Sequence, residues 1–216
     1  MIRVKICCIQ AIQEAKLAID SGAAALGLVT EMPSGPGVAT YETISEILKS
    51  TPPAIGTFLL TSKRTSKEII FQHNRCPSNA IQLTDSLETN ELLKLRDHLP
   101  AIKLIQVIHV LGEVSIYEAV AISPNVDAIL LDSGNPNLIV KQLGGTGKVH
   151  DWKISRRIRD EIGIPLFLAG GLNSENVAEG IRQVEPFGVD VCSGVRTNDS
   201  LDPVKIERFM AEVDQF

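Results

Sequence analysis

The chain has 216 residues, a formal net charge of -5 and an isoelectric point near 5.4. This acidic balance, with no basic run, argues against the surface with which proteins neutralise nucleic-acid phosphates. No stretch approaches the roughly 20 apolar residues of a membrane span, and the N-terminus lacks the apolar core of a secretory signal. We therefore expect a cytoplasmic protein that has neither nucleic acid nor a membrane as a partner.

Short β-branched runs alternate with amphipathic stretches of helical length, which is the pattern of successive βαβ units in a parallel sheet. The predicted strands are residues 3–7, 25–29, 54–60, 80–83, 103–108, 127–131, 165–169 and 188–192. The predicted helices are residues 12–20, 41–49, 65–73, 88–97, 115–122, 152–160, 174–183 and 203–213. Capping chemistry precedes the last two helices, at Asn173 and at Asp202.

Eight strand–helix units predict an α/β protein with a single-domain (βα)8 TIM barrel over residues 1–216. A doubly wound sheet would show the same alternation, but it commonly closes with about five or six strands. In a barrel the ligand site lies at the C-terminal ends of the strands. The residues that end the predicted strands are therefore the first candidates for chemistry.

Glycine turns follow the last two predicted strands, in the segments LAGGLNSENV and VCSGVRT. Glycine lets backbone amides approach an anion closely, and a helix that begins in the turn adds the positive end of its dipole. A single turn of this kind is as often a plain connection, but two on adjacent strands favour a phosphate site. The predicted phosphate-binding residues are Gly170, Gly171, Ser193 and Gly194.

The run LGGTGKVHDW after the sixth predicted strand lies in a loop that is longer than its counterparts. Long loops in compact domains are usually functional or disordered, and glycine-rich loops also occur as plain connectors. If this loop is functional, it folds over the ligand and offers Lys148 as a cation.

Cys7 ends the first predicted strand and Asp132 ends the sixth, so we expect a thiol and a carboxyl group at the rim of the barrel. A thiolate can remove a proton from carbon, and a carboxylic acid can protonate a sugar ring oxygen. Lys5 has the same strand parity as Cys7, and a cation below the thiol would favour the thiolate. The alternatives are a buried structural cysteine and a helix cap or ion-pair partner.

No metal site is expected from the remaining titratable residues. The four histidines do not cluster with carboxylates at metal-ligand spacing, and the cysteines lack the paired spacing of a zinc site. We assign Cys8, Cys76 and Cys192 to structure.

Taken in order, VKICCI, ILLDS, GGTGKVHDW, LAGGLNSENV and VDVCSGV resemble the phosphoribosylanthranilate isomerase family over nearly the whole chain. The resemblance implies a (βα)8 barrel of tryptophan biosynthesis that catalyses an Amadori rearrangement of an aminoaldose phosphate without a cofactor. It places the general base on Cys7 and the general acid on Asp132. It implies phosphate contacts from Gly145, Gly170, Gly171, Ser193 and Gly194.

The chain departs from the family pattern in three places. Cys8 stands where the family usually has glycine. Gly35 and Pro36 occupy the stretch where the family has a basic residue that meets the anthranilate carboxylate. Thr84 and Asp85 replace the histidine and glycine that commonly follow the fourth strand. The last two changes concern the aromatic side of the substrate, so we expect the phosphate side to be retained.

Three functional hypotheses follow. The first is a phosphoribosylanthranilate isomerase, an aldose–ketose isomerase whose partner is a phosphorylated sugar. The second is a divergent barrel that binds a phosphosugar without turning it over. The third is an isomerase or aldolase for a different phosphosugar. The sequence leaves the oligomeric state open.

Overall fold

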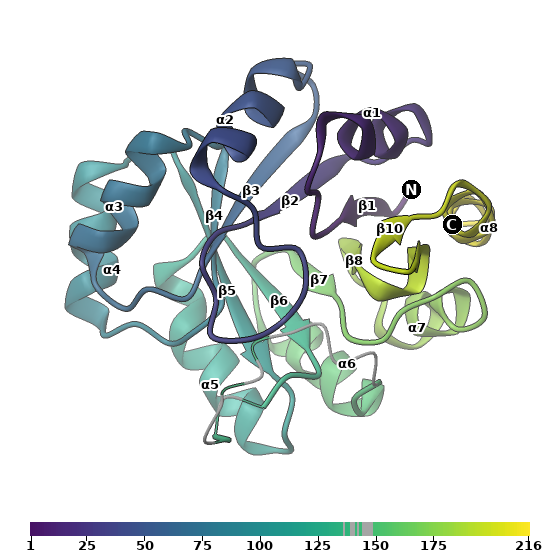
Figure 1. Cartoon of the computed structure of the whole chain (residues 1–216). Coiled ribbons are helices and arrows are strands. Elements are labelled where there is room, and N and C mark those ends of the chain that lie inside the picture. The colour runs from purple at the N-terminus through teal and green to yellow at the C-terminus, as the bar shows by residue number, and fades with distance from the viewer. Residues whose placement is uncertain (136, 139–140, 142, 144–148) are drawn as a thin grey trace.

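The computed structural model is a closed barrel of eight parallel strands, ringed by helices (Figure 1). It describes residues 1–135, 137, 138, 141, 143 and 149–216. The strands are β1 Arg3–Ile6, β2 Ala25–Val29, β3 Gly56–Thr61, β4 Ala80–Leu83, β5 Lys103–His109, β6 Ala128–Asp132, β7 Leu166–Leu168 and β8 Gly188–Val191. The helices are α1 Ile12–Asp20, α2 Tyr41–Ser50, α3 Ser66–Arg75, α4 Thr89–His98, α5 Val114–Ile122, α6 Trp152–Glu161, α7 Val177–Val184 and α8 Pro203–Val213.

Three short elements complete the described fold. A 3-10 turn, η1 Ser123–Asn125, follows α5, and a second, η2 Ser193–Val195, follows β8. The strands β9 Arg196–Thr197 and β10 Ser200–Leu201 pair antiparallel next to η2. No helix in the described ranges is both long and apolar enough to cross a bilayer.

The predicted barrel and its eight strands are confirmed, and the largest error lies at the start of α7. That helix begins at Val177 and not at residue 174. The side chain of Asn176 accepts from the backbone amide of Asn173 at 2.9 Å, and the side chain of Asn173 accepts from that of Glu175 at 2.8 Å. These local bonds hold a turn that competes with the helix. The cap predicted at Asp202 is present, because its carboxylate accepts from the first amides of α8.

The described core has three clusters of buried apolar side chains. The smallest, Cys7, Cys8, Val29 and Leu60, lines the cavity described below, and the other two form its main parts. The larger part lies between the strands and the surrounding helices, and it contains most of the buried aliphatic side chains. The smaller part fills the barrel interior and consists of Ala80, Ile105, Val107, Ala128, Leu130, Phe167 and Ala169. Phe58 packs edge-on against Phe167 there, with ring centroids 5.9 Å apart. This interior cluster packs beneath the residues at the C-terminal ends of the strands and supports them.

Barrel closure sets which residues face one another at that end. β1 pairs with β8, and the register places Lys5 opposite Asp190. β5 pairs with β6, and the register places His109 opposite Asp132. The closure therefore brings residues from the first and last strands of the barrel into one site.

Candidate active site

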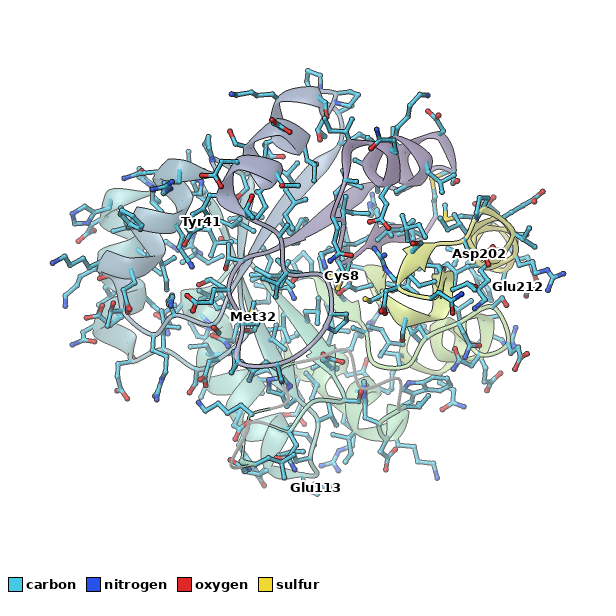
Figure 2. All side chains as sticks on the ribbon, viewed as in Figure 1. Cys8, Met32, Tyr41, Glu113, Asp202 and Glu212 are labelled. Atoms are coloured by element: carbon cyan, nitrogen blue, oxygen red, sulfur yellow. The ribbon has the colours of Figure 1, made fainter. Side chains whose placement is uncertain are left out.

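A cavity of about 700 Å³, its open mouth included, lies at the C-terminal ends of the strands. Both predicted catalytic residues, Cys7 and Asp132, line it. Figure 2 shows Met32, on the loop between β2 and α2, and Cys8 near the centre of the barrel mouth. The other lining residues are Val29, Ser34, Gly35, Pro36, Leu60, Gln82, Thr84, Leu130, Leu143, Ala169, Gly170, Gly171, Leu172, Asp190, Cys192 and Ser193.

Lys5 lies inside the barrel, as its strand parity predicts, and it is fully buried. Its ammonium donates to the Asp190 carboxylate at 2.8 Å. Burial by itself would lower the pKa of Lys5, but the adjacent Asp190 raises that pKa above its usual range. The lysine therefore stays charged inside the barrel.

Gly27 allows this lysine and the Cys7 thiol to lie close to each other. A side chain at Gly27 would meet Cys7 Sγ at 2.7 Å and Lys5 Nζ at 3.0 Å. Any larger residue would have to displace one of the two groups. The glycine on β2 is thus a steric requirement of the thiol–ammonium arrangement.

The Cys7 thiol has a pKa below its ordinary value. A hydrogen bond from the Cys8 thiol is the main cause, burial opposes it, and the charge of Lys5 contributes in the same direction as Cys8. The Cys8 thiol has a raised pKa, because it hydrogen-bonds to both Cys192 and Cys7. Of Cys7 and Cys8, Cys7 is therefore the thiol that ionises first.

Our assignment of Cys8 and Cys192 to structure alone was wrong, because both line the cavity and Cys8 acts on Cys7. Cys8 has a φ of 64°, a left-handed conformation that favours glycine. A side chain at Gly37 would meet Cys8 Cβ at 2.3 Å, so the cysteine is accommodated by a glycine in the facing loop. Cys76 is buried away from the cavity, against the backbone of Tyr41.

Arg196 holds the turn that carries Cys7 and Cys8, a role that no sequence motif indicated. Its guanidinium donates to the carbonyls of Cys8 and Cys7, the second at 3.4 Å. Glu14 on α1 anchors the same guanidinium at 2.8 Å. A buried planar group with several donors can fix a backbone turn in this way.

Asp132 ends β6 and is 8% exposed. Burial raises the pKa of its carboxyl group, and the bond it accepts from the Ser133 amide at 2.7 Å opposes this. The thiol and the carboxyl group are thus shifted in opposite directions, the thiol toward the thiolate and the carboxyl toward the acid.

Gln82 on β4 adds a polar atom that the sequence did not single out. Its side chain lines the cavity and is 4% exposed. Within the part of the chain that the structure describes, its carbonyl oxygen Oε1 is buried and accepts no hydrogen bond. Buried polar atoms are nearly always partnered, so this oxygen is suited to accept from a ligand hydroxyl.

The predicted phosphate residues lie together on the β7 and β8 side of the cavity. Gly170 and Gly171 have φ angles of 81° and 65°, and they line the cavity with Ser193. A side chain at Gly170 would approach the Ser133 amide at 2.9 Å. Gly194 lies behind the lining, where a side chain would meet the Leu172 carbonyl oxygen at 2.0 Å. The two turns are therefore packed against each other through backbone.

The predicted glycine loop lies largely outside the described residues. Gly145 and Lys148 lie outside the described residues. His150, just after them, has a pKa lowered to about 4 because it is buried, so it is uncharged at pH 7. Among the described residues, no group of three or more His, Cys, Asp or Glu side chains could hold a metal ion.

Comparison with known proteins identifies the family. A sequence model described as "N-(5'phosphoribosyl)anthranilate (PRA) isomerase" matches residues 4–212. The chain belongs to this isomerase family. A curated N-(5'-phosphoribosyl)anthranilate isomerase of Methanosarcina acetivorans is 37% identical, covering 98% of this chain and 92% of the relative. One of Haloarcula marismortui is 31% identical, covering 100% of this chain and 97% of the relative.

Solved structures agree with that membership. The phosphoribosyl anthranilate isomerase of Thermotoga maritima matches with a TM-score of 0.87 and 30% identity, with full coverage of both chains. An isomerase in complex with reduced 1-(o-carboxyphenylamino)-1-deoxyribulose 5-phosphate matches with a TM-score of 0.83 and 27% identity, again over both whole chains. The same fold is thus found in complex with a phosphorylated ligand in a relative.

Two of the three departures expected from the sequence lie on the β2 and β4 side of the cavity, and the third, Cys8, follows β1. Gly35, Pro36 and Thr84 line the cavity directly. Asp85, next to Thr84, forms an ion pair with Lys141. Ser34 donates to the backbone carbonyl of Lys141. The two altered loops are therefore joined through one residue of the loop that follows β6.

Proposed function

We propose that the protein isomerises N-(5'-phosphoribosyl)anthranilate in tryptophan biosynthesis, with Asp132 as general acid and Cys7 as general base. The observation that carries the residue assignment is that these two groups line one cavity and have pKa values shifted in opposite directions. Perturbed titratable groups that share a cavity are typical of catalytic sites. The family membership supports the choice of reaction.

The first half of the reaction opens the sugar ring. The Asp132 carboxylic acid protonates the furanose oxygen, the bond between that oxygen and C1' breaks, and the nitrogen lone pair forms an iminium bond to C1'. Burial favours this step, because it raises the pKa of the carboxyl group and so favours its protonated form. The carboxylate that remains is stabilised by the Ser133 amide.

The second half moves a proton from carbon. The Cys7 thiolate removes the C2' proton, which gives an enolamine that becomes the ketone when C1' is protonated and the C2' hydroxyl proton leaves. The substrate and product are isomers, so the proton taken by Cys7 balances the one given by Asp132. Gln82 Oε1 is suited to accept from a sugar hydroxyl during both steps.

The phosphate is held at Gly170, Gly171, Ser193 and Gly194; the family resemblance adds Gly145, which lies outside the described residues. Glycine turns supply backbone amides at close range, which suits an anion in a protein of net negative charge. Fixing the phosphate holds the sugar between the acid and the base, and this positioning is itself a large contribution to rate.

The test is a fluorescence assay that follows consumption of freshly generated phosphoribosylanthranilate. We expect Asp132→Asn and Cys7→Ala each to lower kcat by about 100- to 10,000-fold, because each removes one proton-transfer group. Asp127→Asn is the matched control, since Asp127 precedes the same strand and pairs with Arg96 and Lys103 at the opposite end of the barrel. It is expected to keep kcat within about twofold.

Two outcomes would count against the proposal. Intact turnover in both active-site variants would overturn the roles of Asp132 and Cys7. A folded wild-type protein that binds a ribose phosphate but shows no turnover would instead favour a barrel that binds a phosphosugar without this activity. A panel of other phosphosugars would then identify the ligand.

A further inference from the structure

The substrate of the proposed reaction carries two anionic groups, a phosphate on the sugar and a carboxylate on the aromatic ring. The phosphate side of the cavity is built from backbone, as described above. The carboxylate needs a partner at the other side, because an unpaired charge in a partly enclosed site is costly. Among the described residues that line the cavity there is neither a lysine nor an arginine.

Two lysines line an adjoining hollow at the mouth of the barrel. This hollow shares Met32 and Leu143 with the cavity, and its other lining residues include Lys63 and Lys141. Lys63 donates to Glu31 at 3.0 Å, and the Glu31 side chain is 78% exposed. Lys141 pairs instead with Asp85, whose side chain is only 9% exposed. Lys141 is therefore the lysine that is paired with a largely buried carboxylate.

Lys141 is fixed from both sides of the cavity mouth. Asp85 holds its ammonium, and the Asp85 carboxylate is itself oriented by the Ser86 amide at 2.9 Å. Ser34, which lines the cavity, donates to the Lys141 carbonyl. Both contacts come from the two loops whose sequences differ from the family pattern.

We propose that Lys141 binds the carboxylate of the substrate's aromatic ring, with Asp85 and Ser34 positioning it. An ammonium has three donors, so it can hold Asp85 and a second carboxylate together. Asp85 keeps the Lys141 side chain at the mouth of the barrel before the substrate arrives. The lysine therefore loses less conformational entropy when the substrate binds. This inference rests on the proposed function, because it takes the aromatic carboxylate of that substrate as its ligand.

The experiment compares two substrates and two variants. The substrates are phosphoribosylanthranilate and N-(5'-phosphoribosyl)aniline, which lacks the carboxylate. We expect Lys141→Met to raise KM for the first about 10- to 100-fold with kcat changed less than about twofold, since a hydrogen bond to a charged group is lost. The loss on the aniline substrate should be at least about tenfold smaller. Lys141→Arg retains the charge and is expected to recover most of the affinity.

Lys63→Met is the matched control, because it removes a lysine from the same hollow without touching Asp85. It is expected to leave the KM of both substrates within about twofold. Equal losses on the two substrates in Lys141→Met, no loss on either, or a carboxylate-specific loss in Lys63→Met would overturn the assignment of Lys141.

A binding measurement separates this inference from the proposed function. Calorimetry with reduced 1-(o-carboxyphenylamino)-1-deoxyribulose 5-phosphate and with its phenylamino counterpart needs no turnover. A selective loss of affinity for the carboxylated ligand in Lys141→Met would support the inference even if wild-type turnover were absent. An active wild-type enzyme whose Lys141→Met variant binds both ligands as before would overturn the inference and leave the proposed function intact.

Discussion

The two halves of the cavity are built from different materials. On the β7 and β8 side, glycine turns present backbone, and Gly170, Gly171 and Gly194 have no room or conformation for larger residues. On the β2 and β4 side, side chains from three loops meet, with Ser34 and Asp85 both bonded to Lys141. Backbone recognition depends on the fold, whereas side-chain recognition can be reassigned by a few substitutions. The departures expected at Gly35, Pro36, Thr84 and Asp85 lie on the second side.

The largest effect on stability is expected from a change inside the barrel, at the buried pair of Lys5 and Asp190. Lys5→Met leaves the Asp190 carboxylate buried without its 2.8 Å partner, which lowers the free energy of unfolding by about 3–5 kcal/mol. Urea denaturation measures this loss. Lys16→Met is the control, because its pair with Asp20 is exposed on α1 and contributes about 0–1 kcal/mol. Similar losses in the two variants would show that the buried pair has no special weight.

A change confined to the β7 and β8 side, the proposed phosphate site, tests its dependence on backbone. Gly194→Ala would place a Cβ 2.0 Å from the Leu172 carbonyl oxygen, so the two turns must separate. We expect a loss of about 1–3 kcal/mol in unfolding free energy and weaker binding of inorganic phosphate, measured by denaturation and calorimetry.

Gly163→Ala is the control for Gly194→Ala, because a Cβ at Gly163 meets no atom within 4 Å. Its unfolding free energy is expected to stay within about 0.5 kcal/mol of wild type. Unchanged phosphate affinity in Gly194→Ala would contradict the view that close contact between the turns forms the phosphate site.

A change in the thiol cluster tests how Cys8 controls the ionisation of Cys7. Cys8→Gly restores the residue usual in the family and removes the hydrogen bond that lowers the pKa of Cys7. The pKa of Cys7 rises, so less thiolate is present at a given pH and the acid limb of kcat/KM moves to higher pH. The loss is therefore largest at low pH and shrinks as the pH increases.

Cys8→Ser keeps a donor and is expected to leave the acid limb closer to that of wild type. The limb that requires a protonated Asp132 should not move in either variant. An acid limb that stays in place in Cys8→Gly would mean that Lys5 alone determines the ionisation of Cys7.

The smallest effect on substrate binding is expected on the β2 and β4 side, the proposed site of the aromatic ring. Ser34→Ala removes one hydrogen bond to the Lys141 carbonyl, which contributes about 0.5–1.5 kcal/mol. We expect KM for phosphoribosylanthranilate to rise about 2- to 10-fold with kcat unchanged, measured by the fluorescence assay. An equal rise for the aniline substrate would indicate a general loosening of the loop.

Much of the fold and part of the candidate site could be predicted from the sequence. The alternation of strands and helices identified the barrel. The hydrophobic periodicity of each strand or helix depends only on residues close in the chain, so it can be read from the sequence. The start of α7 was missed, because Asn173 and Asn176 form side-chain bonds that resemble a cap three residues early. The roles of Cys8, Gln82 and Arg196 were missed, because each depends on neighbours that only the folded barrel brings close.

The sequence by itself determined the barrel, the glycine turns and the ends of the strands that carry Cys7 and Asp132, since local periodicity and backbone conformation encode them. Only the tertiary structure decided which charges meet. Asp85 and Lys141 are 56 positions apart, and Arg196 reaches the Cys8 carbonyl across 188 positions. Such contacts form when the barrel brings distant segments together, as it brings β1 against β8, and their energies depend on burial that no short segment possesses.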